Sequence, residues 1–337
     1  MNKTDLSFTP CGIEVSFQTL LVDRAGKAPR EFPNTPAGHR ALLAWLRRSP
    51  LPLRVCMEAT GLYRLDLALQ LAAAGIPLLV ANPRAVRHFA RAMMQRSKTD
   101  LLDAAVLREF AARMPFEPWQ PPSPSALNLM ALAHRLQALT RMLAAEKNRL
   151  HAASLSRALP DLVRRDVVRS MQGLGRAIRR LTQEALLFIA DDPQLARRTE
   201  LLLSIPGIAT TSALHLLAEL LRFGPDSHVR QWVAYAGLDP RAHVSGTSVA
   251  KKPAISKAGN AHLRRALYMP ALGASQHEPY LRAFYQHLQQ RGKTKLQALV
   301  AVMRKLLHAI FGMFKHNAAY DGSKVYVLKP KAELLCA

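Results

Sequence analysis

The chain has 337 residues, 49% of them apolar, so it is long enough to bury cores in two or three domains. Lys and Arg number 47 against 23 Asp and Glu, which gives a net charge of +24. A charge this large favours a polyanionic partner, because cationic side chains release the counterions that condense on phosphates. A solvated basic surface that serves only solubility is the alternative.

Cysteine content and the N-terminus predict where the protein works. No basic stretch followed by an apolar run opens the chain, and the apolar segment LALQLAAAGIPLLVA is interrupted by Gln, Gly and Pro. Neither a disulfide framework nor a zinc spacing fits the three cysteines, Cys11, Cys56 and Cys336. We therefore expect a cytoplasmic protein in a reducing compartment that does not span a membrane.

The first 114 residues alternate between strand and helix patterns. Residues 12 to 22, GIEVSFQTLLV, begin with alternating apolar and polar positions, which is typical of a strand. The turn DRAGK precedes a short strand near PREF, so the domain is expected to open with a hairpin. Two helix patterns then alternate with the strands LRVCME and IPLLVA before a helix from Pro83. This alternation predicts a parallel sheet with helices on both faces.

A proline-rich segment separates this domain from a helical region. Residues 115 to 125, PFEPWQPPSPS, hold five prolines and cannot continue a helix, so they are interpreted as a linker. From Leu129 to Leu143, leucines recur at alternating spacings of three and four, and Leu150 continues the series with Glu146 at the position between. This spacing predicts a helical hairpin or short coiled coil within residues 126 to 197, and a candidate dimer contact. An ordinary amphipathic helix packed within the same chain would give the same pattern.

Residues 198 to 320 form the predicted C-terminal domain, which is mainly α-helical and is followed by a tail at 321 to 337. The stretch LLLSIPGIATTSALHLLAELL has two helix patterns around a Pro-Gly turn, as in a helix-hairpin-helix. There the turn at Gly207 and the next helix could offer backbone N–H groups to a phosphate, although a turn without a ligand also fits. A loop at 237 to 259 precedes helices near 260 to 275 and 294 to 316.

Four acidic residues form a candidate metal site. If Thr99 caps a helix, Asp100 and Asp103 lie on one face of its first turn, where the helix dipole favours ionised carboxylates. Aspartates are also common in the first turn of helices that bind no ligand, and this is the alternative interpretation of the pair. Glu14 lies in the first strand and Glu58 at the end of LRVCME, the edge at which open α/β sheets build their sites. Because charges in a covered sheet need a partner, the four acids could bind one or two magnesium ions.

A second centre is the basic stretch HVSGTSVAKKPAISKAGNAHLRR, residues 243 to 265. A serine beside Gly in such a loop can approach a phosphate closely, and the surrounding cations offset the phosphate charge. A flexible phosphate-binding loop without catalysis is the alternative. The serines and candidate phosphate-binding cations are Ser245, Ser248, Lys251, Lys252, Lys257, Arg264 and Arg265.

The motifs GIEVS, EATG, KTDLLDA, IPGI, YAGL, SGTS, ISKAGN and LRRALY resemble, in order, the DEDD transposases of the insertion-sequence one-ten family. The resemblance runs from about residue 11 to 316. It implies a RuvC-like first domain of the RNase H type, whose four acids hold Mg²⁺ or Mn²⁺ and map onto Glu14, Glu58, Asp100 and Asp103. The family's first acid is normally aspartate, so Glu14 is a departure that alters the reach of one ligand.

The resemblance also implies a nucleophile. The serine of the family's SG motif maps onto Ser245, with Ser248 as a second candidate three residues later. Attack on a DNA phosphodiester would form a covalent phosphoserine link, with metal stabilising the developing charge. Such exchange needs no ATP, and the chain has no Walker-type phosphate loop. Lys98, next to the acids, is a further predicted phosphate contact.

Family members bind a structured non-coding RNA that pairs with target and donor DNA. The resemblance therefore implies both duplexes and a guide RNA as partners, and a dimer that assembles into a tetramer in the cytoplasm, associated with the nucleoid. The resemblance thus implies an RNA-guided serine recombinase of an insertion sequence. Two alternatives are a RuvC-like metal-dependent nuclease or junction resolvase without a serine nucleophile, and a nucleic-acid-binding protein whose acids have decayed.

Overall fold

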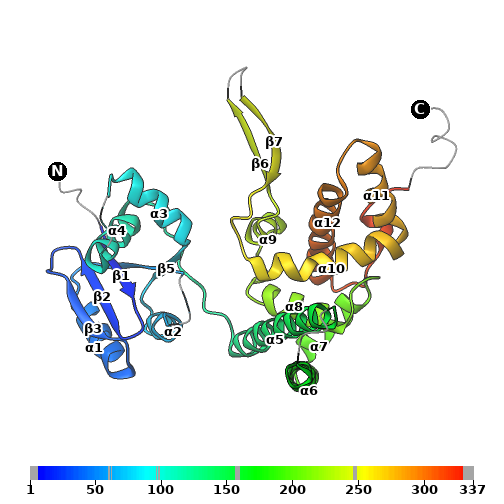
Figure 1. The fold of residues 1–337 in the computed structure, drawn as a ribbon. Coiled ribbons are helices and arrows are strands. Elements are labelled where there is room, and N and C mark those ends of the chain that lie inside the picture. The colour runs from blue at the N-terminus through cyan, green and yellow to red at the C-terminus, as the bar shows by residue number, and fades with distance from the viewer. Residues whose placement is uncertain are drawn as a thin grey trace. The chain divides into compact units, whose positions relative to one another are not determined.

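The computed structural model of the chain describes residues 7–59, 61, 63–95, 97, 99–155, 160–245 and 249–328, with the backbone alone for 242–253. The chain divides into two compact units, Met1–Pro121 and Pro122–Ala337. The boundary lies inside the proline-rich segment 115 to 125. Figure 1 shows a sheet with helices in the first unit, whereas the second is built mostly of helices.

The first unit is built on a five-stranded mixed sheet in the order β3-β2-β1-β4-β5. β1, β4 and β5 pair in parallel, and β2 pairs antiparallel with both β1 and β3. The predicted hairpin followed by parallel strands is therefore confirmed. The strands are β1 (Thr9–Val15), β2 (Thr19–Arg24), β3 (Arg30–Pro33), β4 (Leu53–Glu58) and β5 (Leu78–Ala81).

The single strand predicted for residues 12 to 22 is wrong, because the chain turns between β1 and β2. The Ser16 N–H donates to Thr19 O at 2.9 Å, and the Thr19 N–H donates to the Ser16 hydroxyl at 3.0 Å. A serine side chain that bonds backbone groups nearby in this way is a turn device. Apolar residues on both sides of the turn hid it in the sequence pattern.

Helices cover both faces of this sheet, as predicted. Helices α1 (Pro36–Leu46) and α2 (Leu65–Ala73) pack on one face, where Leu42 and Leu67 join Ile13 in a buried core. Helices α3 (Pro83–Ala92) and α4 (Asp100–Arg113) form a second core with Cys56. The two cores lie on opposite faces because successive strand residues alternate in direction.

Gly12 in β1 allows α4 to pack directly on the sheet. A Cβ atom at this buried position would lie 2.1 Å from the Ala104 carbonyl oxygen and 2.4 Å from the Arg108 nitrogen. Both atoms belong to the backbone of α4, so a side chain at Gly12 could be accommodated only by moving the helix. Because α4 begins at Asp100, Gly12 also fixes where the two predicted aspartates lie.

We expect Gly12→Ala to lower the free energy of unfolding by about 2–3 kcal/mol, because overpacking displaces α4 from β1. Scanning calorimetry of the full chain measures this loss. Gly173→Ala is the matched control, since Gly173 lies in a helix with no atom within 4 Å of an added Cβ, and there a gain of about 0.5–1 kcal/mol is expected. Unchanged unfolding of Gly12→Ala would contradict the close packing.

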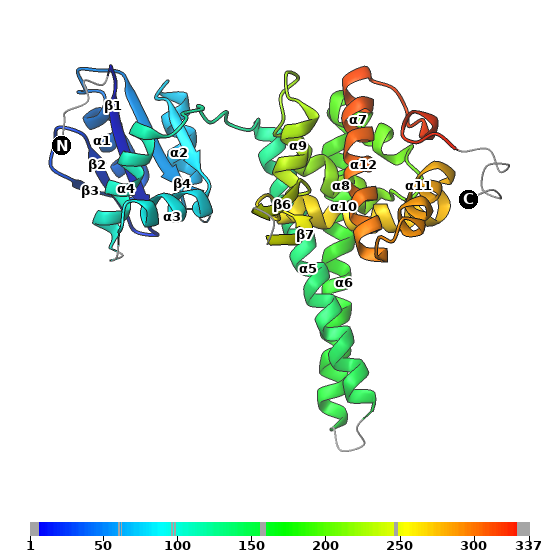
Figure 2. The same cartoon turned by 90° about the horizontal axis from the view of Figure 1, so that it is seen from above.

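The second unit begins with a long helical hairpin, α5 (Pro124–Ser154) and α6 (Asp161–Ala190), which Figure 2 shows side by side. Leu129 and Leu136 on α5 belong to the hydrophobic core of this unit, and Leu139 is buried as well. The predicted hairpin is confirmed, and much of its leucine face packs within the chain. A dimer contact through this region stays a prediction.

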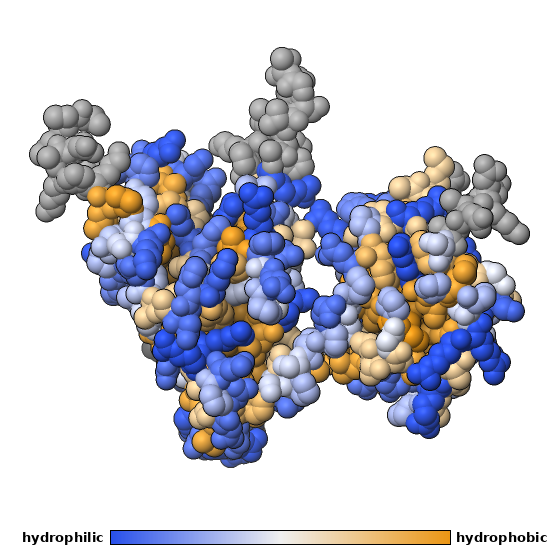
Figure 3. All heavy atoms as spheres, turned by 180° about the vertical axis from the view of Figure 1, so that it is seen from behind, coloured by the Kyte–Doolittle hydropathy of each residue, from blue (hydrophilic) through white to orange (hydrophobic). Residues whose placement is uncertain are grey.

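The rest of the second unit forms a helical core in which α8 (Thr210–Leu220) and α12 (Lys295–His316) are extensively buried. Within the described residues, α12 alone has the length and apolar composition to cross a membrane, but Leu306, Leu307 and Ile310 pack it into this core. Hydrophilic residues cover much of the face of each unit seen in Figure 3. The remaining elements are α7 (Pro193–Leu203), α8 (Thr210–Leu220), α9 (Val229–Ala236), β6 (Pro240–Ser245), β7 (Val249–Ile255), α10 (Ala261–His277), α11 (Pro279–Gln290), α12 (Lys295–His316) and the short η1 (Gly322–Lys324).

Candidate active site

Glu14 and Glu58 occupy neighbouring positions at the carboxyl edge of the sheet. They extend the parallel register of β1 and β4 by one residue beyond the pair Ile13 and Met57. Gly12, two positions before Glu14, faces α4, and side chains alternate along a strand. Both glutamates, each partly exposed, therefore lie on the face of the sheet that α4 covers.

The first turn of α4 carries the two aspartates. The Thr99 side chain accepts a hydrogen bond from the Leu102 N–H at 3.3 Å, so the predicted N-cap is confirmed. Asp100 and Asp103 follow it in the first turn, Asp100 exposed and Asp103 partly buried. Both carboxylates therefore lie at the positive end of the helix dipole.

The start of α4 lies at the same edge of the sheet as the two glutamates. Arg54, near the start of β4, lies over the rings of Phe8 at 3.7 Å and Phe116 at 5.4 Å. Phe116 follows the end of α4, and Phe8 precedes β1, so α4 ends where these strands begin. Its first turn consequently lies where β1 and β4 end, beside Glu14 and Glu58.

The four acids thus gather at one edge, and their oxygen atoms suit a hard divalent cation. Across the described residues, no three of these carboxylates bring ligand atoms within 4.8 Å of one another. Four like charges repel at short range, so a cation is what would draw them into one coordination shell. Lys98, predicted to contact phosphate beside them, lies outside the described residues.

The thiols of Cys11 and Cys56 lie in β1 and β4, the strands that carry Glu14 and Glu58. Burial raises the pKa of the Cys56 thiol to about 12, with Glu58 adding to the shift, and burial also raises the pKa of Cys11. A thiol that stays protonated at neutral pH is neither a nucleophile nor a ready metal ligand. Both side chains are therefore packing residues of the sheet.

Ser245 ends strand β6 at the far end of a two-stranded hairpin. Strands β6 and β7 pair antiparallel, with a bulge between Arg241 and His243, and Ser245 forms the last pair with Val249 before the tip. Figure 1 shows this hairpin standing away from the helices around it. The prediction of a loop for residues 237 to 259 is therefore wrong, because this segment contains a β-hairpin. Its content of Gly, Ser and Lys is typical of a loop. Ser248 and the side chains of Lys251 and Lys252 lie outside the described residues.

Other predicted phosphate contacts lie at the base of the hairpin. The Lys257 N–H donates to Gly237 O at 3.1 Å, and the Arg264 guanidinium donates to Ala236 O at 2.8 Å. Arg265 donates to the Gln137 side chain at 2.8 Å. These bonds brace the base of the hairpin, and each guanidinium has further N–H groups with which to bind a phosphate.

Gly207 lies in the turn between α7 and α8. Its φ of +99° is in the region that favours glycine, and a Cβ there would lie 2.6 Å from the Ala274 nitrogen of α10. The residue is exposed on its other side. The glycine is therefore required for close packing against α10, whether or not the turn also binds a phosphate.

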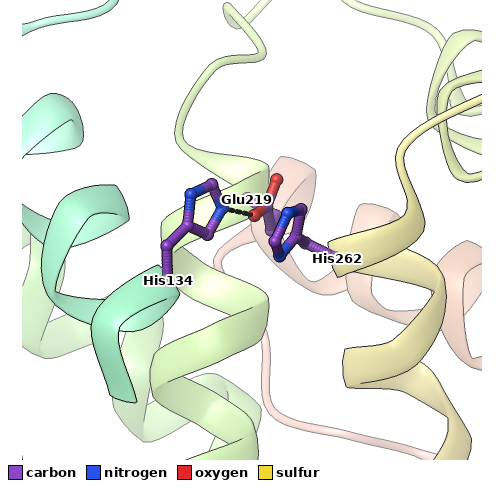
Figure 4. Close-up of side chains that lie close together, drawn as sticks. All are labelled: His134, Glu219 and His262. Atoms are coloured by element: carbon purple, nitrogen blue, oxygen red, sulfur yellow. Dashed lines mark hydrogen bonds and ion pairs between the residues drawn. The ribbon is translucent and has the colours of Figure 1, made fainter. Parts of the chain in front are cut away.

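A third cluster was not predicted from the sequence. His134 of α5, Glu219 of α8 and His262 of α10 point toward one another, as Figure 4 shows. His134 Nε2 lies 2.6 Å from Glu219 Oε1, and the two imidazole rings stack at 4.0 Å. Burial lowers the pKa of His262, and His134 lowers it further. The three residues are far apart in sequence, and only the acid inside the apolar run LLAELL signalled a buried polar site.

Comparison with known proteins identifies the family. Residues 12–160 match a family of transposases, DEDD_Tnp_IS110, and residues 199–286 match the transposase IS116/IS110/IS902 family. The chain is 31% identical to the pilin gene-inverting protein of Moraxella bovis over 294 residues, which cover 86% of this chain and 89% of that protein. The chain belongs to the IS110 family of transposases. The family predicted from the motifs is thus confirmed, and this IS110-family member is a DNA transposase or recombinase enzyme.

Two other relatives support the assignment of the chain to the IS110 family. The pilin gene-inverting protein of Moraxella lacunata is also 31% identical over 294 residues, covering 86% of this chain and 89% of the relative. The insertion element IS110 protein of Streptomyces coelicolor is 32% identical over 123 residues, covering 36% of this chain and 29% of that protein. The predicted role as a recombinase of an insertion sequence is confirmed at this level.

Proposed function

We propose that the chain is a metal-assisted serine recombinase that cuts and rejoins DNA through a phosphoserine intermediate. The observation that carries this proposal is the gathering of Glu14, Glu58, Asp100 and Asp103 at one sheet edge. Acids from two strands and a helix meet there, as expected for a RuvC-like site, and the five-stranded mixed sheet is consistent with that fold. The four residues belong to the region that matches the DEDD family.

These four acids would hold Mg²⁺ or Mn²⁺. When bound, the cation supplies stabilisation of the negative charge that develops on the phosphate and on the leaving oxygen. Asp100 and Asp103 lie at the positive end of the α4 dipole, while the close contact of α4 with Gly12 sets their distance from the strands. Glu14, in place of the family's aspartate, reaches one methylene further toward the same centre.

In the proposed reaction, the Ser245 hydroxyl attacks a backbone phosphorus of the DNA. The Oγ–P bond forms, one P–O bond of the strand breaks, the serine proton leaves, and the departing oxygen takes a proton. A hydroxyl from another strand then attacks the phosphoserine, which releases Ser245 and joins the new partner. The phosphodiester energy is conserved throughout. The place of Ser245 at the far end of an extended hairpin suits delivery of a nucleophile to a large substrate.

The same proposal implies DNA and RNA as partners of the protein. A structured guide RNA would pair with target and donor DNA, so that the protein binds mainly backbone and duplex shape. The net charge of +24 supports contact with nucleic-acid phosphates. The proposed phosphate contacts are the turn at Gly207 and the side chains of Lys98, Lys251, Lys252, Lys257, Arg264 and Arg265.

Two paired strand exchanges would need a dimer that assembles into a tetramer in the cytoplasm, associated with the nucleoid. The α5–α6 hairpin supports such an assembly, because Leu155 and Leu162 at its end are 77% and 72% exposed. Contiguous exposed apolar patches mark contact surfaces, and these two side chains would form part of one. We propose this end of the hairpin, rather than its packed leucine face, as the contact between copies.

The test is a strand-exchange reaction with the full chain, its guide RNA, target and donor duplexes and Mg²⁺. The expected product is a new junction that joins the two DNAs. Cut ends that never join would support a metal-dependent nuclease instead. Binding of both duplexes without any cleavage would indicate a nucleic-acid-binding protein with decayed acids.

A further inference from the structure

We infer that His134, Glu219 and His262 form a binding site for a divalent transition metal of the zinc class in the second unit. One ligand atom from each residue lies within 4.8 Å of the others. The site is separate from the four acids of the first unit and goes beyond the proposed recombination chemistry. Two imidazoles and one carboxylate are a ligand set that zinc uses, whereas magnesium prefers oxygen atoms alone.

The protonation of His262 can be read from its partners. The Gln137 side-chain atom that accepts from Arg265 must be the oxygen, because a guanidinium can only donate. His262 Nδ1 lies 2.6 Å from that same oxygen, so Nδ1 carries the proton. The lone pair of the neutral ring is then on Nε2. A metal-binding histidine is oriented by a hydrogen bond from its other nitrogen in just this way.

Hydrogen bonds also fix the orientation of the Glu219 side chain. Asn260 Oδ1 accepts from the backbone N–H groups of His262 and Leu263, so its Nδ2 is the donor that binds Glu219 Oε2 at 2.7 Å. This bond leaves Oε1 directed at His134. The glutamate side chain is only 2% exposed, and a carboxylate this deeply buried is costly without compensation for its charge.

Binding needs the two stacked imidazole rings to tilt toward a common point, whereas one pair of ligand atoms already lies close to the spacing of zinc ligands. Nε2 of His134 and Oε1 of Glu219 are 2.6 Å apart, and two ligands of one zinc ion lie roughly 3 Å apart, so a small separation makes room for the ion. The His134 side chain is 38% exposed, which gives an ion from solvent a route to the site. Three protein ligands leave one tetrahedral position for water.

A metal ion at this site would stabilise the base of the β6–β7 hairpin. Its ligands come from α5, α8 and α10, three helices that meet where the chain returns from β7. Asn260, which orients Glu219, also caps α10 and donates its backbone N–H to Tyr235 O at 2.5 Å at the end of α9. An ion bound here would hold both ends of the hairpin against α5.

The test is zinc binding by the full-length chain, without DNA. Chelator-treated protein is titrated with Zn²⁺, with Co²⁺ absorption as a second probe of low coordination number. We expect His134→Gln to weaken zinc binding at least tenfold, the scale of losses around metal sites, and Zn²⁺ to raise the melting temperature of the wild type but not of this variant. His151→Gln is the matched control, because His151 is an exposed histidine on the same helix.

Equal zinc affinity in the wild type and in His134→Gln would overturn the site. If that variant does not fold, the X-ray absorption edge of zinc bound to the wild type decides, since imidazole ligands support the site and oxygen-only ligation refutes it. Asp100→Asn should keep this zinc ion, so failure of the recombination proposal and failure of the zinc site are distinguishable.

Discussion

Ser245→Ala is expected to abolish strand exchange, with a loss of at least about 10³-fold in the rate of junction formation. Alanine has no hydroxyl with which to form the phosphoserine ester that conserves the energy of the broken phosphodiester bond. The change removes one oxygen at the far end of β6, where the backbone is paired with Val249, so folding should be unaffected. Gel analysis of joined products, with DNA binding measured in parallel, provides the readout.

Ser248→Ala is the control for this change, because it removes a second hydroxyl from the same basic stretch. It should retain strand exchange while Ser245→Ala does not. The reverse pattern would reassign the nucleophile to Ser248. If both single variants recombined at the rate of the wild type, the serine mechanism itself would be wrong.

Asp100→Asn should reduce Mg²⁺-dependent cleavage by at least about 10²-fold, because an amide is a poor ligand for a hard cation. The side chain keeps its shape and is exposed at the start of α4, so the loss of stability should be limited to the dipole contribution of about 0.3–1 kcal/mol. Cleavage is measured over a range of Mg²⁺ concentrations, which separates weaker metal binding from loss of the chemical step.

The matched control is Asp161→Asn, which changes an exposed aspartate in the first turn of α6. It should leave cleavage intact while losing a similar dipole contribution. Asp100→Asn with the magnesium dependence of the wild type would remove the four acids from the mechanism and leave them as helix and strand residues.

Much of the first unit could be predicted because its signals are local. The N-cap at Thr99, the strand at Leu53–Glu58 and the helices between strands all follow from neighbouring residues. The convergence of Glu14 and Glu58 also followed, since parallel strands end at one edge of a sheet. The turn at Ser16 did not, because its hydrogen bonds lie within an apolar run that continues the strand pattern.

Features that depend on contacts between residues far apart in the sequence could not be predicted from it. The β6–β7 hairpin is defined by pairing across a segment rich in Gly, Ser and Lys, and this composition is equally typical of a loop. His134, Glu219 and His262 meet only because α5, α8 and α10 pack around one core. No spacing rule links residues on three separate helices, so packing alone shows this cluster.

The most direct test of the central claim is to trap the cut DNA before it rejoins and to identify the attached peptide by mass spectrometry. We expect a phosphodiester bond between the DNA and Ser245, formed in the presence of Mg²⁺ and absent from Asp100→Asn. Cut DNA that carries free ends and no attached peptide would show that water is the nucleophile and would contradict the serine mechanism.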